Sequence, residues 1–253
     1  MRYASLRQGL VGAWCPSLGP SGNTLLDRSG WNGHAALTNM DAGTAWRSRQ
    51  NGWWLGFDGV NDVATAGNYQ AANVGTGPYT VSFFVLAAPV TKQSAVIAKD
   101  DWDIATTGFL FYTDTGAPNS IFHWASFSTG RSFGAIADNT IHHCVVSRLS
   151  TGTNDTRQYL DGRLINTYTD SSNYTNSRSL TFGNDDVGDK AFPGSLNDIR
   201  LYTRGITEQE VRLLAREPGI GLMPERTSVF FGADLFSAAW LSRQSTIIGG
   251  GVA

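Results

Sequence analysis

The sequence predicts an all-β fold, a two-sheet antiparallel jelly-roll sandwich with one short C-terminal helix and an extended tail. The first observation is composition: the chain has 29 Gly, many Thr, Ser and Asn residues and only 16% charged residues, which is typical of sandwiches with many loops. The second is that short apolar or alternating runs recur between clusters of turn-forming residues. With 253 residues, 41% of them hydrophobic, the chain can bury a sizeable core.

These runs predict about fourteen strands. In chain order they are GLVGAW, HAALTN, WWLGFDG, DVATA, YTVSFFVLAA, SAVIAK, GFLFYT, SIFHWA, SFGAIA, IHHCVVSRL, RQYLDG, RLINTYT, SLTFGN and SLNDIRLYTR. The Asp161-Gly162 pair predicts a hairpin between the eleventh and twelfth runs, because a type I′ turn needs positive φ at both central positions.

One helix is expected after the last strand. Thr207 and Glu210 form a Thr-x-x-Glu capping box, in which the hydroxyl and the carboxylate each accept a hydrogen bond from a backbone amide. Ile206 precedes the cap and can pack onto Val211, and Pro218-Gly219 stops the helix. These roles explain the glutamates of this segment without catalysis.

Two regions are expected, a sandwich domain over residues 1–218 and a C-terminal extension over residues 219–253. The extension is apolar and has no clean period. It either folds back over the sandwich or docks onto another subunit, and docking is favoured because exposed apolar segments need a partner. The expected docking residues are Phe230, Phe231, Phe236, Trp240, Leu241, Ile247 and Ile248.

Charge and hydropathy exclude several classes of partner. The net charge is −2 and the sequence pI is about 6.1, and without a basic stripe we expect no nucleic-acid binding. No run reaches the ~18 apolar residues of a membrane helix. The start, MRYASLRQGLVGAW, lacks the apolar region of a secretory signal. Either a signal was trimmed or the protein is made without Sec export, and the second is favoured because Met1 leads almost directly into a strand-like run.

The chain has two cysteines, Cys15 and Cys144. Cys144 falls in the apolar run IHHCVVSRL, where a free buried thiol is expected. Spacing alone leaves a bridge between the two cysteines open.

The ordered set of runs resembles the laminin-G-like and pentraxin-like branch of the concanavalin A-like jelly rolls, from about Gly9 to Pro218. Its most specific parts are Phe57-Asp58-Gly59, the His-His strand followed by YLDGR, and the terminal strand and helix. The resemblance implies that the strand Ser195–Tyr202 pairs within a sheet and that the helix lies against its end. It favours no single function, because lectins, adhesion modules, glucanases and virion proteins share this fold.

No catalytic residue is expected. Glucanases of this superfamily use two glutamates on one strand, and retaining hydrolysis needs carboxyl groups about 5 Å apart. Here all four glutamates, at positions 208, 210, 217 and 225, lie at or beyond the terminal helix. No Gly-x-Ser-x-Gly elbow is present, and His142 and His143 are expected to serve packing or hydrogen bonding.

Calcium is the one cofactor that the resemblance implies. Pentraxin-like relatives hold calcium with acidic loops in two places, and calcium takes oxygen ligands from Asp, Asn and carbonyl groups. The corresponding positions here are Asp100, Asp101 and Asp103 in one loop and Asn184, Asp185, Asp186 and Asp189 in the other. The alternative is that these Asn, Asp and Gly residues only form turns.

Glycan binding would require an exposed aromatic ring beside polar groups, so that the ring stacks on a sugar face. Trp102, inside the acidic loop and next to Asp101, is the strongest candidate. Most other tryptophans are expected in the core.

Three functions are compatible with these observations. The favoured one is a non-catalytic structural or adhesion protein on the surface of a phage particle, a decoration or fibre component whose tail docks and whose sandwich faces outward. Phage lysis would release such a protein without Sec export. The second is a secreted, extracellular, calcium-dependent lectin module, and the third is a glycoside hydrolase. The favoured function predicts a homo-oligomer or a virion assembly.

Overall fold

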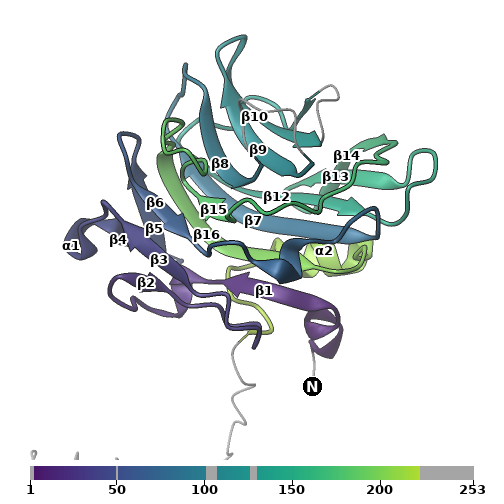
Figure 1. The fold of residues 1–253 in the computed structure, drawn as a ribbon, viewed down its shortest axis with the longest axis horizontal. Coiled ribbons are helices and arrows are strands. Elements are labelled where there is room, and N and C mark those ends of the chain that lie inside the picture. The colour runs from purple at the N-terminus through teal and green to yellow at the C-terminus, as the bar shows by residue number, and fades with distance from the viewer. Residues whose placement is uncertain (1–2, 50, 101–106, 126–129, 223–253) are drawn as a thin grey trace, which may run out of the picture. The chain divides into compact units, whose positions relative to one another are not determined.

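A computed structural model describes residues 3–49, 51–100, 107–125 and 130–222 (Figure 1). The chain divides into two units, residues 1–223 and residues 224–253. The first unit extends past the expected boundary at residue 218, because Ile220 and Leu222 are buried in its core. The expected docking residues of the tail, from Phe230 onward, lie outside the described residues.

The first unit contains two eight-stranded sheets, called sheet A and sheet B here, and all described pairings are antiparallel. Sheet A contains, in spatial order, β14 (Arg163–Tyr168), β13 (Thr156–Leu160), β12 (Ile141–Arg148), β7 (Tyr79–Ala87), β16 (Pro193–Tyr202), β5 (Gly52–Asp58) and β4 (Trp46–Arg49), with β1 (Leu10–Trp14) also paired to β16. Sheet B contains β11 (Arg131–Ser132), β10 (Ala117–Ala125), β9 (Phe109–Asp114), β8 (Ser94–Lys99), β15 (Thr181–Phe182), β6 (Val63–Thr65), β3 (Ala35–Thr38) and β2 (Thr24–Leu25).

The expected all-β sandwich is therefore confirmed, and so is the pairing of the final strand. β16 pairs with β7 along one side, while its other side pairs first with β5 and then with β1. The change of partner coincides with a bulge at Asp198, whose φ is 43°. The hairpin turn is also confirmed, with φ of 51° at Asp161 and 78° at Gly162.

The main core lies between the two sheets. Alternate side chains of β7, including Val81, Phe83 and Val85, meet Phe109 and Phe111 of β9, and all five are buried. This period-two pattern leaves the intervening residues of β7 on the opposite face of sheet A, which is called the outer face here.

A second apolar layer covers part of this outer face. Helix α2 (Glu208–Leu214) places Val211 and Leu214 against Val145 and Tyr159 of sheet A, and Figure 1 shows the helix beside the end of β16. The expected capping box of Thr207 and Glu210 is present in full. The terminal helix thus lies against the sandwich at the end of the last strand, as the resemblance implies.

Several short elements differ from the expectation. Helix α1 (Ala42–Ala45), capped by Asp41, was not expected, nor were β2 and β4 or the 3₁₀ turns η1 (Ala4–Arg7), η2 (Pro16–Leu18) and η3 (Gln70–Ala72). The expected strand SFGAIA is mostly a loop that buries Phe133 and Ile136 and passes through positive φ at Gly134. Cys15 and Cys144 are both buried and free, so no bridge joins them.

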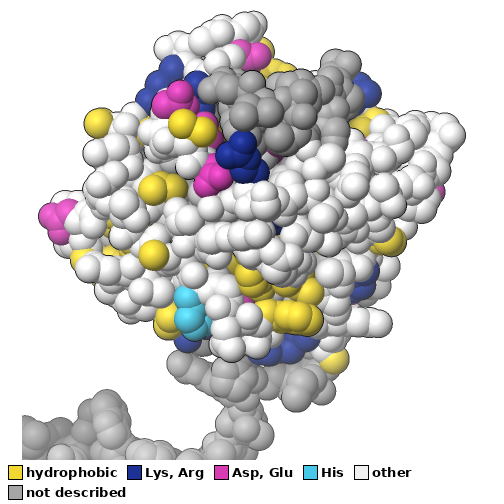
Figure 2. Space-filling view, viewed as in Figure 1, with side chains coloured by type: hydrophobic (Ala, Val, Ile, Leu, Met, Phe, Trp, Pro, Cys, Tyr) yellow, Lys and Arg dark blue, Asp and Glu magenta, His cyan; other side chains and the backbone are white. Residues whose placement is uncertain are grey.

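Two surface properties bear on partners. None of the helices in the described part of the chain has the length and apolarity that a membrane-spanning segment requires. On the face that Figure 2 shows, basic side chains lie among acidic ones near the upper end, and much of the remaining described surface is uncharged polar side chain or backbone.

Candidate functional site

The outer face of sheet A is open at one end. Register places Ile141, Leu86, Ser195 and Gly56 opposite one another across four neighbouring strands. Directly opposed residues share a face, and their chain neighbours Val85 and Leu196 point into the main core. The four residues therefore form one row on the outer face.

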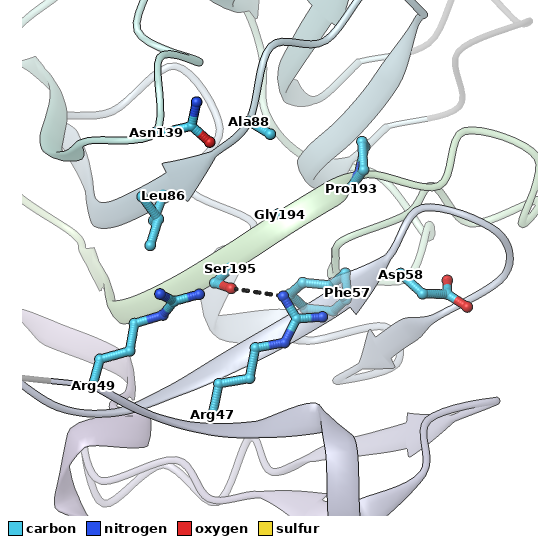
Figure 3. A pocket seen from close by; sticks show the side chains of 10 residues that line it. All are labelled: Arg47, Arg49, Phe57, Asp58, Leu86, Ala88, Asn139, Pro193, Gly194 and Ser195. Carbon is cyan, nitrogen blue, oxygen red and sulfur yellow. Dashed lines mark hydrogen bonds between the residues drawn. The ribbon is translucent and has the colours of Figure 1, made fainter.

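Leu86 and Ser195 of this row line an open pocket of about 510 Å³ (Figure 3). Strands β4, β5, β7 and β16 contribute its walls, together with Ala88 just after β7 and the loop that carries Asn139. The lining residues are Arg47, Arg49, Phe57, Asp58, Leu86, Ala88, Asn139, Pro193, Gly194 and Ser195. Pockets of ~300–1,000 Å³ are typical of small-molecule sites.

Arg47 lies over the sheet in a space that exists because Gly56 has no side chain. A β-carbon at Gly56 would overlap the Arg47 guanidinium, so glycine leaves the space that this group occupies. Nη1 of Arg47 donates to Oγ of Ser195 over 3.4 Å, and Ser195 is almost completely buried. The guanidinium is therefore positioned across β5 toward β16.

The pocket carries positive charge. Figure 3 shows the guanidinium groups of Arg47 and Arg49 pointing toward β16, and neither forms an ion pair with another described residue. Asp58 is the only carboxylate among the lining residues. Its Oδ1 accepts from the Val60 amide over 2.7 Å, and its side chain points away from both guanidinium groups. The lining thus holds two cations and one carboxylate, and the buried Asp62, which is not part of the lining, interacts with Arg47 through charge.

The opposite wall is polar at one point and apolar elsewhere. Asn139 lies across the pocket from the arginines, with φ of 69° and its amide donating to the Ala87 carbonyl over 2.9 Å. Leu86 and Ala88 supply apolar surface. The exposed tryptophans Trp31 and Trp53 do not line the pocket, so hydrogen bonds and charge would hold a ligand here.

A hydrogen-bonded group fixes the loop that carries Asn139. Nδ1 of His142 lies 2.8 Å from Oδ2 of Asp161, and Nε2 lies 3.3 Å from Oδ2 of Asp138. Burial acts to lower the pKa of His142, but the hydrogen bonds to Asp161 and Asp138 outweigh it and raise that pKa above its usual value. Hydrogen bonds from Thr140 lower the pKa of Asp138 to about 2.

The loop predicted for calcium is closed mainly by its own backbone. Oδ1 of Asn184 accepts from the amides of Asp185 and Lys190, both over 3.0 Å. Oδ1 of Asp185 accepts from the amides of Gly188 and Asp189 over 2.7 and 3.1 Å. These are the turn-forming roles that the alternative interpretation predicts.

The other two acidic residues of this loop form ion pairs with cationic side chains. Arg178 lies 3.7 Å from Asp186, and Lys190 lies 3.1 Å from Asp189. Lys99 is buried nearby, and its Nζ donates to Oδ1 of Asn176 over 3.1 Å and to the Arg178 carbonyl over 3.0 Å. Burial lowers the pKa of Lys99 to about 8, while the charge of Asp186 acts in the opposite direction.

The described residues alone do not fit a calcium ion, which takes about 6–8 oxygen ligands. Among them, no three His, Cys, Asp or Glu residues come together to hold a metal, although Oδ2 of Asp185 is buried without a hydrogen-bond partner. Asp100 is buried next to the end of β8. Asp101, Trp102 and Asp103 lie outside the described residues, so calcium and the predicted sugar-stacking role of Trp102 stay predictions.

His143 forms the one Ser–His hydrogen bond in the described part of the chain. Its Nε2 lies 2.9 Å from Oγ of Ser82, beneath the layer that covers the outer face. Nδ1 of His143 is buried without a partner, so no carboxylate orients the ring. Burial lowers the pKa of His143 to about 4. Both side chains are buried beneath the second layer, so a substrate cannot reach this pair.

A family model described as the concanavalin A-like lectin/glucanases superfamily, of the laminin G type, matches residues 57–212. The chain belongs to this superfamily. The match includes the pocket strands β7 and β16, whereas Arg47, Arg49 and Gly56 precede it. The resemblance that the sequence motifs indicate is thereby confirmed. No curated protein matches the sequence.

Solved structures with a similar fold include three kinds of protein. The sialidase of Trypanosoma rangeli, in complex with a difluoro-KDN, has a TM-score of 0.59 at 15% identity over 82% of this chain and 32% of its own. The binding domain of Paraclostridial Mosquitocidal Protein 1 has a TM-score of 0.63 at 15% identity, covering 83% of this chain and 52% of its own. Domain 4 of AbnA, a GH43 extracellular arabinanase from Geobacillus stearothermophilus, was solved in complex with arabinotriose. It has a TM-score of 0.61 at 19% identity, covering 82% of this chain and 98% of its own.

The chain therefore spans about a third of the sialidase and about half of the mosquitocidal binding-domain structure. At these identities the similarity shows the fold alone. Carbohydrate-binding domains are nevertheless among the proteins that share it.

Proposed function

We propose that residues 3–222 form a non-catalytic glycan-binding domain whose site is the pocket on the outer face of sheet A. The pocket itself carries the proposal: it is open, about 510 Å³ in volume, and offers guanidinium, hydroxyl and amide groups around apolar surface. A few convergent polar groups in a largely preformed cavity are the usual construction of a small-ligand site.

The acid content of the pocket supports binding without hydrolysis. Glycoside hydrolysis by the usual mechanisms needs two carboxyl groups flanking the scissile bond. The lining contains Asp58 alone, and the only glutamates of the described chain lie at or after α2. The arabinotriose complex of the structurally similar arabinanase domain supports a carbohydrate ligand for this fold.

A glycan array probed with the full chain tests this proposal. We expect binding to at least one glycan class, and a bulky substitution of the small wall residue, Ala88→Trp, should abolish it by filling the pocket. Arg163→Gln, on the exposed strand β14 at the far edge of sheet A, is the matched control and should bind normally. Failure to bind any glycan, or binding untouched by Ala88→Trp in a folded variant, would refute the proposal.

A second candidate function is assembly through the C-terminal tail, as a decoration or fibre component on a phage particle with the sandwich as its adhesion domain. The observation that favours it is the apolar sequence of residues 224–253. Light scattering compares the full chain with a chain ending at residue 223. We expect an oligomer for the first and a folded monomer for the second; a monomeric full chain would contradict self-assembly.

A further inference from the structure

We infer that the pocket selects an acidic sugar, one that carries a carboxylate, and that Arg47 is the residue that determines this selection. The inference rests on the proposed function and names its ligand class. Its basis is a guanidinium that the fold positions at the pocket without an ion pair among the described residues, although the buried Asp62 interacts with it through charge.

The fold positions Arg47 by two means. Gly56 provides the space for the guanidinium, and Oγ of Ser195 accepts one hydrogen bond from Nη1 over 3.4 Å. A guanidinium has five N–H donors in a planar fork. Among the described residues, no second group accepts a hydrogen bond from the Arg47 guanidinium.

Three other arginines with restricted exposure have acidic or carbonyl partners within the chain. Arg200 forms two 2.8 Å hydrogen bonds with Asp198, and Arg204 forms an ion pair with Glu210 over 2.7 Å. Arg148 donates to backbone carbonyls such as that of Ser172 over 2.7 Å. Arg47 differs from these three because its charge faces the pocket rather than an internal partner.

A carboxylate matches this unsatisfied fork. Arginine binds carboxylates through two parallel N–H···O bonds, which give geometric specificity as well as energy. The carboxylate of a sugar acid on Arg47 would leave its hydroxyl groups near Ser195 and Asn139, and its ring over the bare backbone of Gly194 beside Leu86. Exposed Arg49 at the rim would add attraction at longer range.

The acidic residue of the lining does not oppose such a ligand. Oδ1 of Asp58 is held by the Val60 and Asn61 amides over 2.7 and 3.4 Å, within its own turn. Its side chain points away from the guanidinium groups (Figure 3). A neutral sugar would leave Arg47 without a charge partner, so the pocket should discriminate by charge.

The test uses the full chain and an array holding uronate, sialate, sulfated and neutral glycans. The best carboxylate-bearing hit is then compared with its methyl ester by calorimetry, because esterification removes the charge and keeps the sugar. We expect the acid to bind at least about tenfold tighter than the ester. Arg47→Gln should abolish this preference, and Arg47→Lys should restore it only in part, because an ammonium lacks the planar fork.

Gly56→Ala is the sharpest variant. It keeps every charge and displaces only the flexible end of Arg47, so the protein should fold while the preference is lost to the same extent as in Arg47→Gln. Arg163→Gln removes one positive charge from β14 and should change nothing. Thermal unfolding of each variant confirms that the fold is retained.

The outcomes separate the two proposals. Equal affinity for acid and ester, or hits confined to neutral or sulfated glycans, would overturn the carboxylate inference and leave glycan binding intact. Absence of any hit would overturn the proposed function as well. An equal loss in Arg163→Gln would show that general charge, not Arg47, attracts the ligand, and would also overturn the inference.

Discussion

His142 links a strand to the loop beside the pocket. Its two ring nitrogens contact Asp161, in the β13–β14 turn, and Asp138, next to Asn139. Both contacts are strongest when the imidazole is protonated and the two carboxylates are charged. The order of this pocket wall should therefore depend on pH.

His142→Gln tests this dependence. The pKa of His142 is raised in the folded protein, so its stabilisation is present below the usual value of 6.5 and is lost as the pH rises through the raised value. We expect the substitution to lower the free energy of unfolding by up to about 1 kcal/mol near pH 5.5 and by much less near pH 8.5. Urea unfolding at both pH values measures this. An equal loss at both, or the same loss when Asp161→Asn is already present, would contradict the ion-pair explanation.

Asp185 is a buried carboxylate in which Oδ1 accepts hydrogen bonds and Oδ2 has no hydrogen-bond partner. Burial raises the pKa of Asp185, and the negative charge of the Asp189 side chain raises it further. The hydrogen bonds from the backbone amides of Gly188 and Asp189 act to lower it. A raised pKa means that the folded state prefers the protonated form, so stability falls as the pH rises through that value.

Asp185→Asn should therefore stabilise the protein by up to about 1 kcal/mol near pH 8 and have little effect near pH 3. The amide keeps one oxygen for the two backbone donors and removes the buried charge. Thermal unfolding in a chelator measures the gain. Repeating it in millimolar calcium tests the calcium prediction, because an ion held by Asp185 would make the wild-type protein the more stable of the two.

At the scale of single elements, β16 carries the most buried charge. Asp198 and Arg200 face each other across its bulge, and both also bind the segment after α2: the Gly219 amide donates to Oδ2 of Asp198 over 2.8 Å, and Nη2 of Arg200 donates to the Ile220 carbonyl over 2.7 Å. The pair thus ties residues 219–220 to the outer face of sheet A.

Arg200→Met should be severely destabilising, by about 3–5 kcal/mol, because it leaves the Asp198 carboxylate buried without its partner. Adding Asp198→Asn removes that charge and should recover part of the loss. Chemical denaturation of both variants measures this. A loss below about 1 kcal/mol for Arg200→Met would show that water or relaxation compensates the carboxylate.

The elements that the sequence predicts well are those with local signals. The capping box fixes α2, and Asp161-Gly162 fixes its hairpin, because each depends on residues within one turn of the chain. β2 and β4 escape prediction because they are short, and only a partner strand defines them.

The candidate pocket escapes prediction for a related reason. Arg47, Ser195 and Asn139 come from distant segments, and each alone resembles an ordinary strand or turn residue. Gly56 falls inside an expected strand, and the sequence does not show that its missing side chain makes room for Arg47. The acidic loop that drew attention instead is conspicuous in sequence because Asn and Asp are dense there, which is the composition of tight turns.

At the scale of the whole unit, sheet A is covered on both faces. The main core lies on one face, and on the other Leu6, Ile206, Val211, Ile220 and Leu222 belong to the second layer. This layer joins the two ends of the described chain, because Arg7 donates to the carbonyls of Gly221 and Leu222 over 3.0 and 2.8 Å. The pocket is the part of the outer face that the layer leaves open.

The boundary of the folded unit follows from this layer. A chain ending at residue 223 should unfold at nearly the same temperature as the full chain, since both cores are complete. A chain ending at residue 218, the boundary that composition suggests, loses the burial of Ile220 and Leu222, worth ~1.5–3 kcal/mol each. It also leaves Asp198 and Arg200 without their contacts at residues 219 and 220. We therefore expect it to be at least about 3 kcal/mol less stable than the longer chain. Calorimetry measures the stability of both truncated chains. Equal stability would show that residues 219–222 do not belong to the core.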